Sequence, residues 1–171
     1  PLLLPLLDQP CPVERMSVVY ALGRNPCPSA VEKLVSLLET DDNAYVRRAT
    51  AWSLANYDDQ IVLEPLINAL KNDVAAVRLW SSSSLAEIGN VSLKNAQLAA
   101  EQLLISLKID NESGVRSNCI WSLCRLYEKL DNTFQESFVD ECTKIALFDK
   151  EPSVMEEAKT ALDSMGMQGF Y

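Results

Sequence analysis

The chain has 171 residues, of which 48% are hydrophobic, and a formal net charge of −9. This length and composition suffice for a buried core, which excludes a disordered chain. The acidic balance and the absence of a visible basic cluster disfavour a nucleic-acid partner, and no apolar stretch approaches the roughly 20 residues that cross a bilayer. We therefore expect no nucleic-acid partner and no membrane span.

The absence of histidine narrows the chemistry further. Without histidine, the chain lacks Ser-His and Cys-His catalysis, His-ligated zinc or iron, and the usual proton shuttle near neutral pH. The carboxylates are spread over turns and solvent-facing positions, and no pair stands out as acid and base. We predict no catalytic residue and no metal site.

The first predicted element is a short apolar segment at residues 1–8. It contains two prolines, lacks a basic leader and runs directly into Asp8, so it does not read as a signal peptide. We interpret residues 1–8 as the remnant of a helix from a preceding repeat. This interpretation predicts that the natural protein extends beyond residue 1.

A segment with the pattern Val-Arg-x-x-small-x-x-x-Leu then recurs along the chain. Three copies are complete, and two weaker flanking copies lack either the valine or the arginine. The copies begin near positions 14, 46, 77, 115 and 154. This period, in the thirties throughout, suits a helix, a turn, a second helix and a linker.

A second amphipathic segment precedes each later copy, at residues 30–38, 62–70, 99–107 and 138–147. Polar turns follow these segments, and we expect their Asp and Asn residues to cap the next helix. The Val, small and Leu positions of each copy lie close together on a helical wheel and form one buried stripe. We predict a single all-α domain over residues 1–171. Its architecture is a right-handed α-α superhelix, with about four full two-helix repeats plus a partial N-terminal one.

Residues 41–73, DDNAYVRRATAWSLANYDDQIVLEPLINALKND, carry a family resemblance. This unit, and most of the chain with it, resembles the HEAT-like repeats of the phycocyanobilin lyase type. The resemblance implies a HEAT-like repeat solenoid whose second helices line a concave face. In lyase members, subunits of this sort pair to attach or detach a linear tetrapyrrole on a phycobiliprotein cysteine.

The resemblance therefore implies a protein-binding module that is a phycobilin lyase subunit or a chaperone-like partner of phycobiliproteins. If the chain is an enzyme, it is a bilin lyase subunit acting with a second subunit, and phycocyanobilin is its ligand. A separate branch with similar repeats is associated with iron-sulfur assembly proteins. The alternative is thus a scaffold that shares an iron-sulfur cluster with a carrier protein.

The aromatic residues of the first helices are candidates for binding a partner or a bilin. Tyr20, Trp52 and Trp121 hold the same place in three copies, well away from the buried stripe on the helical wheel, and Trp80 lies nearer the seam. Aromatic side chains in register can form a partner surface or a platform for a flat ligand. In this hypothesis the second helices hold a phycobiliprotein helix while a tryptophan shields the bilin. The alternative is packing between adjacent first helices.

An arginine recurs with the repeat period. The four repeat arginines are Arg15, Arg47, Arg78 and Arg116. We interpret them as structural, with hydrogen bonds to the turn of their own or the next unit through Asp42, Asp73 or Asp110. The alternative is a basic ladder for a propionate or an acidic partner.

The five cysteines show no C-x-x-C spacing, and their odd number disfavours a disulfide framework. This pattern indicates a reducing, cytoplasmic location. Cys119 and Cys142 are expected in the core. Cys11 and Cys27 each lie between two prolines in predicted turns. They are the candidate reactive thiols or cluster ligands of the iron-sulfur alternative.

Overall fold

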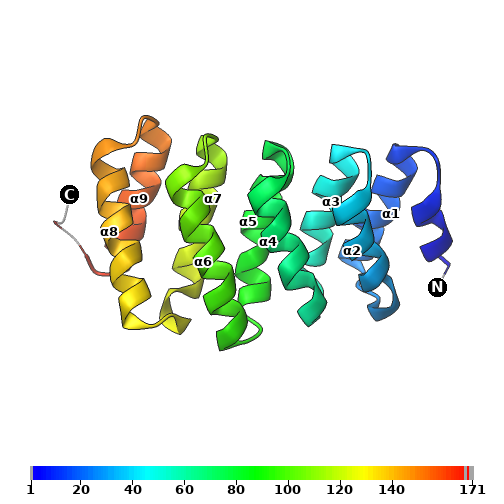
Figure 1. Cartoon of the computed structure of the whole chain (residues 1–171), viewed down its shortest axis with the longest axis horizontal. Coiled ribbons are helices and arrows are strands. Elements are labelled where there is room, and N and C mark those ends of the chain that lie inside the picture. Colours follow the sequence, from blue (N-terminus) through cyan, green and yellow to red (C-terminus); the bar gives the residue numbers. More distant parts are fainter. Residues whose placement is uncertain (1, 168, 170–171) are drawn as a thin grey trace.

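The structure is a computed structural model that describes residues 2–167 and 169, and all the secondary structure in these residues is helical (Figure 1). The α-helices are α1 (Pro12–Arg24), α2 (Val31–Thr40), α3 (Ala44–Leu54), α4 (Leu63–Asn72), α5 (Ala75–Gly89), α6 (Leu93–Ile109), α7 (Ser113–Leu126), α8 (Asn132–Phe148) and α9 (Pro152–Ser164). The 3-10 helices are η1 (Leu4–Asp8), η2 (Pro28–Ala30), η3 (Gln60–Val62) and η4 (Tyr127–Lys129). Within the described ranges, no helix is long and apolar enough to cross a membrane.

Successive helices form two-helix repeats that stack along one axis, which confirms the predicted α-α solenoid (Figure 1). The complete repeats are α1–α2, α3–α4, α5–α6 and α7–α8, with η1 before them and α9 after them. Odd-numbered helices are the first helices of their repeats, and α2, α4, α6 and α8 are the second helices. Each first helix begins two residues before the recurring motif that it carries.

Two of the second helices begin earlier than their amphipathic pattern predicts. Helix α6 begins at Leu93 because the Ser92 side chain accepts a hydrogen bond from the Asn95 amide. Helix α8 begins at Asn132, where the Asp131 side chain accepts one from the Phe134 amide. Serine and aspartate are common N-cap residues. In both helices the cap starts the helix before the amphipathic segment, so that the first turns have only weak apolar periodicity.

The prediction that turn residues cap the first helices is right at only one turn. The Asn43 side chain accepts hydrogen bonds from the Tyr45 and Val46 amides in the first turn of α3. Helices α5, α7 and α9 have no side-chain cap. The aspartates of these turns instead directly follow the ends of the second helices, where they pair with arginines.

The first helices form a closely packed row because the residues at their contacts are small. The small position of every motif copy is buried: Val18, Thr50, Ser81, Cys119 and Ala158. Three buried serine hydroxyls cross from one first helix to the preceding one, donating to backbone carbonyls: Ser53 to Val19 at 3.2 Å, Ser84 to Ala51 at 2.8 Å and Ser122 to Ser82 at 2.8 Å. These bonds satisfy buried hydroxyls and link consecutive repeats.

The second helices contact one another less than the first helices do. Each second helix packs mainly on the first helix of the following repeat, and α6 packs on the first helix of its own repeat as well. Residues such as Leu66 and Leu103, which are fully buried, lie on the inner faces of these helices. The molecule therefore has a continuous row of first helices and a row of separated second helices. The space between neighbouring second helices opens as grooves on the second-helix face.

Candidate functional site

A ladder of arginine–aspartate pairs runs along the turns that join the repeats. The guanidinium Nε and Nη2 of each repeat arginine donate to both carboxylate oxygens of one aspartate, at 2.7–3.0 Å. The pairs are Arg15–Asp41, Arg47–Asp73, Arg78–Asp110 and Arg116–Asp149. Bidentate pairing of this geometry is strong and directional.

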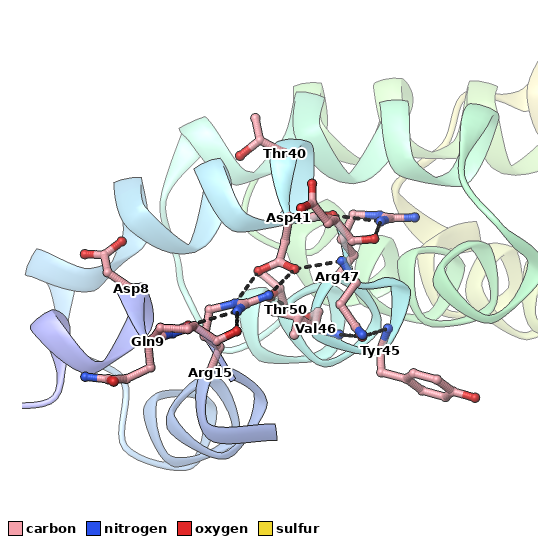
Figure 2. A network of polar contacts seen from close by, with 12 residues as sticks. Asp8, Gln9, Arg15, Thr40, Asp41, Tyr45, Val46, Arg47 and Thr50 are labelled. Carbon is pink, nitrogen blue, oxygen red and sulfur yellow. Dashed lines mark hydrogen bonds and ion pairs between the residues drawn. The ribbon is translucent and has the colours of Figure 1, made fainter. Parts of the chain in front are cut away.

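Each arginine also reaches back to the turn before its own helix, as Figure 2 shows for Arg15 and Arg47, so the ladder is continuous. Arg15 Nη1 donates to the carbonyl of Gln9 at 2.9 Å, and Arg47 Nη1 donates to the carbonyl of Asp41 at 2.8 Å. Asp41 thus accepts from one arginine through its side chain and from the next through its backbone. The ladder ends at Asp149, because the next arginine position, in α9, is occupied by Met155.

The structural interpretation of the arginines holds, but the predicted partner Asp42 is wrong. Asp42 is exposed, and its carbonyl rather than its carboxylate accepts from Arg47, at 3.3 Å. Burial by itself would raise the pKa of Asp41. Hydrogen bonds from Arg15 and from the Asn43 amide outweigh burial and hold that pKa below its ordinary value. The same balance lowers the pKa values of Asp73, Asp110 and Asp149.

The four candidate aromatic residues differ in their surroundings. Tyr20 and Trp52 pack on each other between α1 and α3, with ring centroids 5.3 Å apart and planes at 57°. Trp80 and Trp121 are 37% and 41% exposed, on α5 and α7. The Arg125 guanidinium lies over the Trp121 ring at 4.8 Å from its centroid.

The difference follows from the residue that faces each aromatic side chain. Ser83 holds, in α5, the position that Tyr20, Trp52 and Trp121 hold in their helices. The smaller side chain leaves a hollow of about 250 Å³ beside Trp121, lined only by residues of first helices. No residue of a second helix lines this hollow. A partner site on the second helices and a ligand site in this hollow would therefore lie at separate places, and the hypothesis that a tryptophan shields a bilin stays a prediction.

The candidate thiols Cys11 and Cys27 lie at opposite ends of α1. A helix of 13 residues is roughly 20 Å long, so these two side chains do not ligate one metal ion or cluster together. Cys11 is exposed, while Cys27 is half-buried and its amide donates to the Tyr57 hydroxyl at 3.3 Å. A hydrogen bond with the Ser29 hydroxyl lowers the pKa of the Cys27 thiol.

The remaining cysteines are held as neutral thiols. Cys119 and Cys142 are buried, as predicted, and burial raises both pKa values far above the ordinary thiol value. Burial also raises the pKa of Cys124 to about 11. In the part of the chain that the structure describes, no three or more Cys, Asp or Glu side chains gather as a metal site.

Grooves open between the C-terminal ends of neighbouring second helices. The N-terminal groove, between α2 and α4, has a volume of about 490 Å³ and includes Pro65 and Asn68 in its lining. The middle groove, between α4 and α6, measures about 540 Å³. The C-terminal groove, between α6 and α8, measures about 400 Å³. Ile109, Asp110 and Asn111 line both the middle and the C-terminal grooves, which therefore adjoin.

The adjoining grooves expose large apolar side chains. Ile105 and Ile109 of α6 are 49% and 72% exposed, and Phe148 at the end of α8 is 80% exposed. Apolar side chains gathered at a hollow on an otherwise polar surface are typical of interaction sites. Sequence reasoning expected a partner on the second helices but named none of these residues, because an amphipathic pattern identifies the buried positions and not which exposed side chains gather in space.

The family is decided by the repeated sequence itself. A model of HEAT repeats matches residues 1–86 and 31–124 of the chain.

The chain belongs to the HEAT repeat family.

Solved structures share this all-helical solenoid fold, at sequence identities that establish the fold alone. A chain of the complex of CpcE and CpcF of phycocyanin lyase from Nostoc sp. PCC7120 is 21% identical, with a TM-score of 0.75, and the match covers 94% of this chain and 96% of that one. A designed armadillo repeat protein in complex with the peptide (KR)4 is 19% identical, with a TM-score of 0.67, and covers 99% and 88%. Kap95p, solved with RanGDP, is 19% identical with a TM-score of 0.67; the match covers 95% of this chain and 23% of Kap95p. No curated protein sequence matches the chain.

Within this HEAT frame, the ladder and the grooves have separate roles. The polar groups of the ladder side chains are largely satisfied within the ladder, since each carboxylate accepts two hydrogen bonds from an arginine and one from a backbone amide. The groove side chains Ile105, Ile109 and Phe148 are exposed instead. The second-helix face is therefore the candidate binding surface of these repeats.

Proposed function

We propose that the chain is a protein-binding HEAT module that holds its partner on the second-helix face, as a phycobilin lyase subunit or a chaperone-like partner of phycobiliproteins. The observation that carries the binding role is the exposure of Ile109 and Phe148 at two adjoining grooves. Burying apolar area of this kind stabilises a complex by roughly 25 cal/mol per Å² before the costs of association.

The lyase form of the proposal is supported by the likeness in fold to a chain of the phycocyanin lyase complex, whose match covers 94% of this chain and 96% of that one. Phycocyanobilin is then a substrate that the complex handles, not a resident cofactor. In this proposal the chain contributes a rigid surface that positions the phycobiliprotein. The bilin-linking chemistry is shared with a second subunit.

Direct binding to apo-phycocyanin, measured by biolayer interferometry, tests the role of the grooves. The double variant Ile109→Asp, Phe148→Asp should weaken binding about a hundredfold, because two exposed apolar anchors become charged. Leu93→Asp is the matched control, since Leu93 is 70% exposed at the opposite end of α6. Equal affinities for both variants would reject the second-helix face as the binding surface.

A bilin-transfer assay tests the lyase role separately. The chain, a second lyase subunit, phycocyanobilin and apo-phycocyanin are mixed, and bilin that stays on the protein after denaturation is measured by visible absorption. We expect attachment, or release from the holo-protein, to depend on this chain. The same rate with the chain omitted would reject the lyase role and leave the binding role to the interferometry.

A further inference from the structure

The adjoining middle and C-terminal grooves are positively charged, although the chain as a whole carries −9. Six cationic side chains and four carboxylates line the two grooves, which gives a local net charge of +2. Three of the carboxylates, Asp73, Asp110 and Asp149, are occupied by bidentate pairing with ladder arginines. The fourth, Glu141, pairs with Lys144 at 3.3 Å.

Lysines supply the excess positive charge. Four of the eight lysines of the chain line these two grooves: Lys71, Lys108, Lys144 and Lys150. All four are exposed, and only Lys144 has an ion-pair partner among the described residues. Lys71 and Lys108 also lie in the last turns of their helices, where a cation is favoured, but Lys150 lies beyond the end of α8. The helix ends therefore do not account for the whole cluster.

The N-terminal groove provides an internal contrast. Its charged lining residues are Glu39, Arg47 and Asp73, and the arginine is paired with the aspartate. No lysine lines that groove. The combination of exposed apolar side chains and free ammonium groups is thus confined, among these grooves, to the surface over α4, α6 and α8.

We propose that the middle and C-terminal grooves bind an acidic polypeptide segment that carries apolar anchor residues. Its apolar side chains cover Ile105, Ile109 and Phe148, and its carboxylates meet the surrounding lysines. Packed helices lie roughly 10 Å apart, so three successive second helices span about 20 Å, or about six extended residues. This inference rests on the proposed protein-binding role, but it does not depend on the partner being a phycobiliprotein.

Synthetic peptides test the charge preference directly. A fluorescently labelled ten-residue peptide of alternating leucine and glutamate is compared, by fluorescence anisotropy, with a peptide in which lysine replaces every glutamate. We expect the acidic peptide to bind at least about tenfold more tightly and to weaken as salt is raised. Equal binding, tighter binding of the basic peptide, or no binding of either overturns the inference.

Matched variants on α6 locate the site. Lys108→Glu should weaken the acidic peptide about tenfold, whereas Lys94→Glu, the same charge change at the other end of the helix, should leave its affinity within about twofold. Ile109→Ser and Leu93→Ser make the corresponding apolar comparison. Equal effects within either pair overturn the inference. A single-stranded oligonucleotide that binds the grooves more tightly than the acidic peptide also overturns it, in favour of a nucleic-acid ligand.

The outcomes separate this inference from the proposed function. Failure of bilin transfer with intact, charge-selective peptide binding rejects the lyase role alone. Groove-dependent binding of apo-phycocyanin with no preference for acidic peptides rejects the acidic-segment inference alone.

Discussion

Replacement of Asp41 by alanine tests the ladder at its first complete step. The carboxylate accepts from Arg15 Nε at 2.8 Å, from Arg15 Nη2 at 2.9 Å and from the Asn43 amide at 2.9 Å, and its side chain is only 3% exposed. Asp41→Ala removes all three bonds and leaves the Arg15 guanidinium without a counter-ion. The neighbouring Asp42→Ala is the matched control, because Asp42 is exposed and its carbonyl, not its carboxylate, accepts the hydrogen bond from Arg47.

The expected loss of stability follows from these contacts. A hydrogen bond to a charged group contributes about 1.5–3 kcal/mol, and two bonds to one guanidinium are not additive. Arg15 keeps the Gln9 carbonyl as an acceptor, and 15% of its side chain is exposed. We therefore expect Asp41→Ala to lower the free energy of unfolding by about 2–3 kcal/mol. For a chain of this size, that lowers the Tm by roughly 4–12 °C.

Thermal and urea unfolding followed by circular dichroism in the far ultraviolet measure the loss. Asp42→Ala should change the free energy of unfolding by less than about 0.5 kcal/mol. A cycle with Arg15→Met should give a coupling energy of about 1.5–3 kcal/mol between positions 15 and 41. If Asp41→Ala and Asp42→Ala destabilise equally, or the coupling is near zero, the ladder does not stabilise the stacking of repeats.

Three further outcomes follow from the same structure. The pKa of Asp41 lies below its ordinary value near 3.9, so the stabilisation from its pair with Arg15 is complete above about pH 5 and is lost as pH falls through the folded pKa. In urea unfolding, the free energy of unfolding should therefore fall less between pH 5 and pH 3 in Asp41→Ala than in the wild type. Gly23→Ala should cost about 1–3 kcal/mol in thermal unfolding, since its Cβ would lie 2.6 Å from a ring atom of α3, whereas Gly114→Ala, with a nearest contact at 3.3 Å, should be neutral or stabilising. Cys27 should react with a disulfide reagent at pH 8 in the folded chain, while Cys119 should react only after unfolding; reaction of both at one rate would contradict the burial of Cys119.

The fold could be predicted because its determinants repeat. A single two-helix unit gives a weak signal, but five copies of one stripe at intervals in the thirties favour stacked hairpins over other all-α arrangements. The early starts of α6 and α8 were missed because Ser92 and Asp131 act through single capping bonds, which leave no apolar periodicity.

The ladder partner was missed by one residue because the turns differ in length. Asp42 and Asp73 both lie four residues before the motif valine, so counting back from the motif aligns them. In the structure, the ladder aspartates instead share the position that follows the end of a second helix. The turn after α4 is one residue shorter than the turn after α2, and this shifts the alignment.

The charge of the grooves could not be predicted from the sequence, because it depends on residues far apart in the chain. Lys71, Lys108 and Lys150 lie about one repeat apart from one another, and along the sequence no basic cluster is visible. The repeat brings equivalent ends of successive second helices together, so one lysine near each end becomes a cluster. Surface composition in a solenoid is set by the repeat register and not by sequence proximity.

This register also separates the part of the chain that maintains the fold from the part that is free to recognise a partner. The first helices touch one another through buried small residues and serine bonds, so a larger side chain there collides with the next repeat. The ends of the second helices face the grooves, where Ile109 or Lys108 can change without disturbing a buried contact. Substitutions on the second-helix face should therefore alter partner preference at little cost in stability, whereas substitutions in the first-helix row should alter stability and leave partner preference unchanged.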